Sequence, residues 1–90
     1  MKTQYEFIHF ELFKKLEKTE LWAMRNNRSS EVLGCIKWYP AWRQYCLLIK
    51  PFDPTAEMVF SKGCLVDIAD FIRQLEEKRQ GKNIITGGIR

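Results

Sequence analysis

Histidine is scarce in this sequence, and its scarcity excludes much of the chemistry that enzymes perform with imidazole groups. His9 is the only histidine, and the chain offers it no recognisable nucleophile or orienting partner. The acidic pairs Asp67/Asp70 and Glu76/Glu77 have the spacing of a solvated helix face, which is far more common than a pair of catalytic carboxylates. We therefore expect a protein that is not an enzyme and that needs no cofactor.

Cysteine is also sparse, and its spacing does not favour a metal site. Cys35, Cys46 and Cys64 would need His9 to complete a Cys₃His set. Structural zinc sites usually present close ligand pairs such as C-x₂-C, which the sequence lacks. We therefore expect no metal, and reduced thiols as in a cytoplasmic protein.

Long apolar runs and phosphate-binding glycine motifs are absent as well. No segment reaches the roughly 18 apolar residues of a transmembrane helix, and the polar residues 1–6 do not begin a secretory signal peptide. These absences predict a cytoplasmic protein with no membrane partner. Neither a P-loop nor a G-x-G-x-x-G pattern occurs, and Gly87-Gly88 alone is too weak a signal for a phosphate site.

The sequence does contain enough apolar and aromatic material for one small folded domain. Hydrophobic residues make up 46% of the chain and charged residues 29%, which is not the composition of a disordered protein. The formal net charge of +4 allows weak attraction to anionic partners. We expect residues 1–81 to form a single α+β domain and residues 82–90 to form a flexible C-terminal tail.

Hydrophobic patterning predicts strands along the first part of the chain. The predicted strands cover residues 3–13, 21–25, 31–39 and 43–50, and a short extended segment follows at 57–60. The charged residues 14–20 form either a hairpin loop or a short helical turn. Residues 26–30 favour a turn because Asn and Ser side chains bond to the nearby backbone, and Pro40 ends the third strand because it has no N–H to donate.

An amphipathic helix is predicted after these strands. Ser61 is a favourable N-cap, with Phe60 and Leu65 as a hydrophobic staple, and Gly81 has the place of the residue that ends the helix. Its apolar stripe consists of Cys64, Leu65, Ile68, Phe71, Ile72 and Leu75. The predicted fold class is therefore α+β, an antiparallel β-meander of four to five strands with one C-terminal helix packed on one face.

The third and fourth strands form the hairpin that decides which side chains face the helix. A tight turn at Pro40-Ala41, or a four-residue loop from Tyr39 to Trp42, predicts the pairs Trp38–Arg43, Ile36–Tyr45, Cys35–Cys46 and Lys37–Gln44. The face assigned to the helix carries Val32, Gly34, Ile36, Trp38, Arg43, Tyr45, Leu47 and Ile49. In this register Trp38 and Arg43 form a cation–π pair of about 0.5–2 kcal/mol, or Arg43 simply covers the edge of the core. A Cys35–Cys46 disulfide is geometrically allowed, but the cytoplasmic location that we infer argues against it.

Positive charge and aromatic rings recur together on the strands and turns around this hairpin. The candidate ligand-binding residues are Arg25, Arg28, Lys37, Trp38, Tyr39, Trp42, Arg43 and Tyr45. Aromatic rings stack on bases and Arg or Lys neutralise phosphate, so this set predicts a small protein that binds nucleic acid or a nucleotide.

Three alternatives stand beside this prediction. The charges solubilise an exposed sheet face and bind nothing, or the same surface binds a protein as an interaction module or inhibitor, or two copies form a homodimer by pairing strand edges. Trp38 and Tyr45 face the helix in the predicted register, so core packing is the alternative role for both.

The sequence also resembles a pattern in small bacterial proteins of phages and mobile elements. The segment at residues 25–46, RNNRSSEVLGCIKWYPAWRQYC, carries the likeness, with Phe60, Cys64-Leu65 and the residues 67–71, DIADF. The resemblance extends over roughly residues 21–75 and departs at Leu47-Leu48, where the pattern has Phe. It implies no known activity. By analogy it implies an accessory protein that binds and blocks a component of the host.

Overall fold

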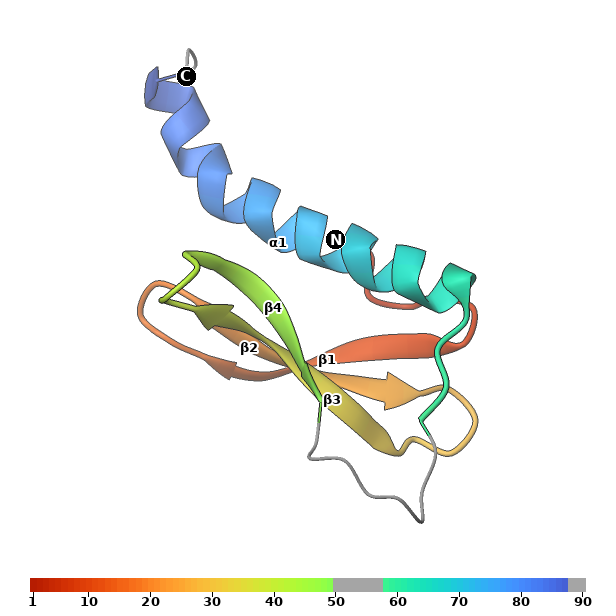
Figure 1. Ribbon diagram of the computed structural model, residues 1–90. Coiled ribbons are helices and arrows are strands. Elements are labelled where there is room, and N and C mark those ends of the chain that lie inside the picture. The colour runs from red at the N-terminus through yellow and green to blue at the C-terminus, as the bar shows by residue number, and fades with distance from the viewer. Residues whose placement is uncertain (50–57, 88–90) are drawn as a thin grey trace.

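The computed structural model describes residues 1–49 and 58–87, with side chains as far as residue 79 (Figure 1). Within these residues the chain forms a four-stranded antiparallel sheet in the order β1-β2-β3-β4 and one helix, so the predicted α+β meander is confirmed. The elements are β1 (Ile8–Lys15), β2 (Glu20–Asn26), β3 (Val32–Tyr39), β4 (Gln44–Ile49) and α1 (Lys62–Gly87). Of the extended segment predicted at 57–60, residues 58–60 form no strand and Glu57 lies outside the described residues.

The hydrophobic core lies between α1 and one face of the sheet (Figure 1). Phe71, in the apolar stripe of the helix, is fully buried. Its ring stacks on that of Phe10 with centroids 4.0 Å apart and meets Trp22 edge-on at 5.0 Å. The helix is thereby held against β1 and β2 by aromatic contacts of the kind whose truncation costs about 3–5 kcal/mol. The other core residues are Tyr5, Ile8, Met24, Ile36, Tyr45, Ile68 and Leu75.

The start of α1 follows the sequence signals. The side-chain oxygen of Ser61 accepts a hydrogen bond from the backbone N–H of Cys64 at 3.2 Å, which confirms Ser61 as the N-cap. Most of the predicted stripe is buried or packed against the core. Leu65 is the exception, since it is more than half exposed and does not belong to the core cluster.

The end of α1 was predicted wrongly. The helix continues past Gly81 as far as Gly87, because a glycine inside a helix costs only about 1 kcal/mol and is not an obligatory stop. Residues 82–87 of the predicted tail are thus helical, and residues 88–90 lie outside the described residues.

The register of the β3–β4 hairpin differs from the prediction by two residues. Trp38 lies opposite Tyr45, and Cys35 lies opposite Leu48. The predicted pairs Trp38–Arg43, Ile36–Tyr45, Cys35–Cys46 and Lys37–Gln44 are therefore wrong, and all three cysteines are free thiols. Because side chains alternate between the two faces of a strand, a shift of two residues leaves each strand residue on its predicted face.

The loop of this hairpin explains the shift. It contains four residues, Pro40 to Arg43, so Arg43 belongs to the turn and not to the strand. Arg43 has a positive φ of 54°, and its N–H donates to the carbonyl of Tyr39 at 2.8 Å. This left-handed conformation is uncommon for a residue other than glycine, so it could not be predicted from the sequence.

The first residues fold back instead of extending the first strand. β1 begins at Ile8 and not at the predicted residue 3, and the N–H of Tyr5 donates to the carbonyl of Ile8 at 2.9 Å. The hydroxyl of Tyr5 donates to Asp70 of α1 at 2.8 Å. The N-terminal segment therefore joins the edge of the sheet to the helix.

Candidate nucleic-acid interface

The eight residues predicted to bind a ligand lie in three separate places. Trp38 and Tyr45 lie on the face of the sheet that α1 covers. Arg25 and Arg28 lie at the end of the sheet where β2 leads into β3. The remaining four, at or near the β3–β4 loop at the opposite end, are Lys37, Tyr39, Trp42 and Arg43. The structure therefore does not gather all eight residues into one surface.

Trp38 and Tyr45 are parts of the packed interior. Tyr45 is buried, and its ring meets that of Trp38 edge-on with centroids 5.5 Å apart. The guanidinium of Arg79 lies 4.0 Å from the centroid of the Trp38 ring. The cation–π pair predicted for Trp38 therefore exists with Arg79 of the helix and not with Arg43. Both rings are therefore engaged in packing between the sheet and α1.

Arg25 has a structural role at the other end of the sheet. Its Nε lies 2.7 Å from Oε1 of Glu11, and one of its terminal nitrogens donates to the carbonyl of Ser30 at 2.6 Å. These bonds tie β1 to the β2–β3 turn. Arg28 is exposed in the same turn. Of the two arginines predicted to bind a ligand at this end, Arg25 is therefore engaged within the fold.

Tyr39 and Trp42 form an exposed aromatic pair at the tip of the β3–β4 hairpin. Trp42 is 65% exposed and Tyr39 is 38% exposed, and their rings meet edge-on with centroids 4.9 Å apart. Lys37 and Arg43 are exposed beside them in the sequence. This tip is the part of the predicted site that the structure does bring together.

The β1–β2 hairpin tip lies at the same end of the molecule. In a meander β1 and β3 run in the same direction, so the loops that follow them lie at the same end of the sheet (Figure 1). Lys78 and Arg79 bring the C-terminal half of α1 to this end through their contacts with Glu20 and Trp38. We call this region the basic end, and its cations are Lys14, Lys15, Lys18, Lys37, Arg43, Lys78 and Arg79.

Five of these cations were missed by reasoning from the sequence. Lys14, Lys15 and Lys18 could have been included, since the meander order alone places the first and third loops together. Lys78 and Arg79 could not be included, because local sequence patterns do not predict the path of the helix across the sheet.

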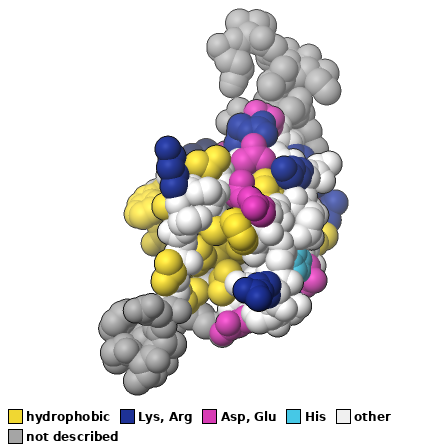
Figure 2. Space-filling view, turned by 90° about the vertical axis from the view of Figure 1, so that its right-hand side faces the viewer, with side chains coloured by type: hydrophobic (Ala, Val, Ile, Leu, Met, Phe, Trp, Pro, Cys, Tyr) yellow, Lys and Arg dark blue, Asp and Glu magenta, His cyan; other side chains and the backbone are white. Residues whose placement is uncertain are grey.

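The opposite side of the molecule has a different charge pattern. Figure 2 shows that side, where acidic and basic side chains are interspersed.

A buried carboxylate organises the basic end. Glu20 is only 8% exposed, and it accepts hydrogen bonds from Lys78 Nζ at 2.8 Å and from Trp22 Nε1 at 2.9 Å. Burial by itself raises the pKa of Glu20, but the hydrogen bonds from Lys78 and Trp22 outweigh it and hold the pKa below the ordinary value. Glu20 is thus an anion that compensates the charge of Lys78.

The acidic residues of the nearby helix are engaged as well. Glu76 accepts the backbone N–H of Tyr45 at 2.9 Å, and Glu77 pairs with Arg73 at 2.9 Å. Glu77 is therefore compensated by Arg73, and the cations of the basic end outnumber the carboxylates beside them.

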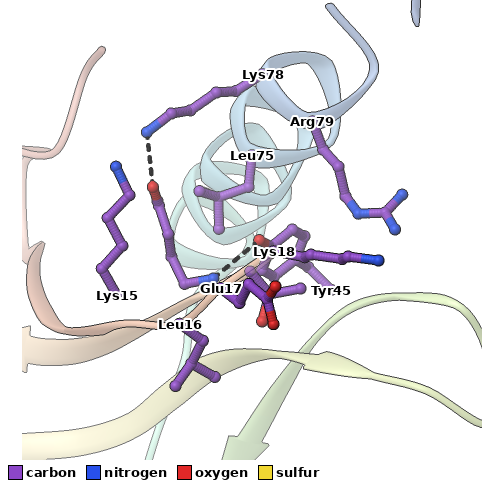
Figure 3. A pocket seen from close by; sticks show the side chains of 10 residues that line it. Lys15, Leu16, Glu17, Lys18, Tyr45, Leu75, Lys78 and Arg79 are labelled. Carbon is purple, nitrogen blue, oxygen red and sulfur yellow. Dashed lines mark hydrogen bonds and ion pairs between the residues drawn. The ribbon is translucent and has the colours of Figure 1, made fainter. Parts of the chain in front are cut away.

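A pocket of about 320 Å³ opens between the β1–β2 hairpin and α1 at the basic end (Figure 3). The residues that line it are Lys15, Leu16, Glu17, Lys18, Thr19, Glu20, Tyr45, Leu75, Lys78 and Arg79. The hydroxyl of Tyr45 accepts the N–H of Glu20 at 3.2 Å. Burial raises the pKa of Tyr45, so its hydroxyl stays protonated near neutral pH and is able to donate a hydrogen bond.

Other kinds of site have little support in the described part of the chain. Nδ1 of His9 lies 2.6 Å from the side-chain oxygen of Asn27, so the histidine is engaged in the fold. Residues 1–49 and 58–87 contain no cluster of three or more His, Cys, Asp or Glu side chains that could hold a metal. Nor does the described chain contain a helix with the length and apolar character needed to cross a membrane.

Comparisons with models of protein families, with curated proteins and with solved structures give no match to this chain. The resemblance to small phage and mobile-element proteins therefore stays a prediction, and the function is argued from the geometry of the basic end.

Proposed function

We propose that this chain is a nucleic-acid-binding protein without enzymatic activity, and that it holds single-stranded nucleic acid at the basic end. The observation that carries the proposal is the exposed Tyr39–Trp42 pair, which lies at the same end of the sheet as cations from both hairpins and from α1. Rings that stack on bases and cations that neutralise phosphates are the two components of sites for single-stranded nucleic acid.

The aromatic pair favours unpaired bases. Stacking requires access to the face of a base, which a duplex hides and a single strand offers. Such stacking contributes about 1–3 kcal/mol per base. Trp42 is the more exposed of the two side chains, and the two rings pack edge-on against each other. Trp42 is therefore the better candidate for a stacking platform.

The distribution of cations favours a strand over a free nucleotide. The positive residues come from three separate elements, the two hairpins and α1, so they extend over a wide surface that includes both the hairpin tip and the pocket beside α1. A strand presents successive phosphates to such a surface, whereas a nucleotide presents a single phosphate group.

We do not propose a dimer joined through the β4 edge. The N–H of Tyr45 points away from β3 and is already bonded to the carboxylate of Glu76. A partner strand would have to displace this helix side chain, which protects the edge as charged groups commonly do.

Truncation of the stacking platform tests the proposal. We expect Trp42→Ala to weaken binding of a fluorescent, hydroxyl-ended oligothymidine roughly five- to a hundredfold, since one stacked base is lost. Phe7→Ala is the matched control, because Phe7 is also more than half exposed but lies at the opposite end of β1. Fluorescence anisotropy measures both affinities, and equal losses in the two variants would contradict the proposed site.

A further inference from the structure

The pocket at the basic end has the properties of a site for a terminal phosphate. We propose, resting on the function proposed above, that the pocket between the β1–β2 hairpin and α1 receives the phosphomonoester at the end of a bound strand. The protein would then prefer phosphorylated ends over hydroxyl ends.

The charge of the pocket matches a phosphomonoester. Its lining residues include four cations and two carboxylates, an excess of two positive charges. Glu20 and Lys78 compensate each other at 2.8 Å, which leaves Lys15, Lys18 and Arg79 to outweigh Glu17. A terminal phosphate carries about −1.5 to −2 charges near neutral pH, about twice the charge of a phosphodiester.

The pocket also presents donors that are held in place. The guanidinium of Arg79 lies 4.0 Å from the centre of the Trp38 ring, and this contact restrains its position before any ligand binds. The protonated hydroxyl of Tyr45 is fixed by the N–H of Glu20 at 3.2 Å. Thr19 adds a second hydroxyl to the lining. Fixed donors lose little entropy when they bind phosphate oxygens.

The size of the pocket and the placement of its cations suit a phosphate group. Figure 3 shows Lys15 and Lys78 on one side of the pocket and Lys18 and Arg79 on the other, with Leu75 of the helix above Tyr45. Its volume of about 320 Å³ is near the lower limit of the roughly 300–1,000 Å³ typical of small-molecule sites. Such a space has room for a phosphate group, and the preference for a chain end follows from the larger negative charge of a phosphomonoester.

Three versions of one oligothymidine test this inference, with hydroxyls at both ends, with a 5′-phosphate and with a 3′-phosphate. We expect one of the phosphorylated forms to bind about tenfold or more tightly than the hydroxyl form, as for charge-assisted hydrogen bonds to one group. The form that gains affinity identifies which end enters the pocket. Fluorescence anisotropy at one fixed salt concentration measures all three.

Two neighbouring lysines provide a matched pair of variants. Lys14 lies opposite Leu21 and Lys15 opposite Glu20, so their side chains are on opposite faces of the sheet, and only Lys15 lines the pocket. We expect Lys15→Gln to abolish most of the preference for a phosphorylated end, and Lys14→Gln to retain it, although each variant loses one positive charge.

The outcomes separate this inference from the proposed function. Equal affinity for all three oligothymidines would overturn the terminal-phosphate site while leaving nucleic-acid binding intact. A preference that survives in Lys15→Gln and Lys18→Gln would also overturn it, because the phosphate would then be read elsewhere. Failure of every oligothymidine to bind would overturn both proposals.

Discussion

Glu20 shows how one buried residue connects the core to the basic end. Its carboxylate accepts bonds from Trp22 in the core and from Lys78 on the helix, at 2.9 and 2.8 Å. Its backbone N–H donates to Tyr45 at 3.2 Å. A buried anion with these partners is stable only as long as the partners are present. The contact therefore fixes the helix to the first hairpin and shapes one wall of the pocket.

The dependence of the free energy of unfolding on pH, from neutral to acidic, tests the role of Glu20. We expect Glu20→Gln to lower the free energy of unfolding at neutral pH by about 1.5–3 kcal/mol, through the loss of a hydrogen-bonded charge. The folded state lowers the pKa of Glu20 below 4.5, so this contribution is present above that pH and is lost as the pH falls through the folded-state pKa. Urea unfolding from neutral to acidic pH measures it. If the difference in unfolding free energy between the unmodified protein and Glu20→Gln stays constant with pH, the role assigned to the Glu20 carboxylate is contradicted.

At the scale of elements, the four strands and the two faces of β3 and β4 followed from the sequence. The alternation around Ile36 and the spacing around Phe71 predict which sides meet, because both patterns depend only on the periods of strand and helix. The register of the hairpin and the end of the helix did not follow. Arg43 takes a positive φ, and Gly81 stays helical. In each case the observed backbone conformation is one that the residue type disfavours only weakly, so the residue type alone did not predict it.

The close approach of β3 to β4 depends on Gly34. A Cβ at this position would lie 2.6 Å from the carbonyl oxygen of Leu48, so we expect Gly34→Ala to destabilise the protein by about 1–3 kcal/mol, as in other overpacked sites. Gly63→Ala is the control, because a Cβ there would lie 3.7 Å from the Ser61 hydroxyl and alanine favours the helix. Urea unfolding measures both. Equal free energies of unfolding for the two variants would show that β3 and β4 move apart at little cost, which would contradict the role of Gly34.

At the scale of the whole molecule, the candidate site is a product of topology. Tyr39, Trp42 and Arg43 could be predicted as a group because they are close in the sequence. Lys18 and Arg79 belong to the same end only because the chain returns twice to it, once in the first hairpin and once in the helix. Arg25 fits the same residue pattern as the others, but it is bonded to Glu11 and Ser30 at the opposite end. Composition alone could not separate these roles.

The salt dependence of oligothymidine binding tests the central claim most directly. If the basic end neutralises three to five phosphates, the logarithm of the association constant falls linearly with the logarithm of salt concentration, with a slope of about −2 to −4. Lys37→Gln should make the slope shallower by about 0.7, whereas Lys62→Gln, which removes an exposed lysine at the far end of α1, should not. A slope near zero, or no binding at low salt, would contradict the account.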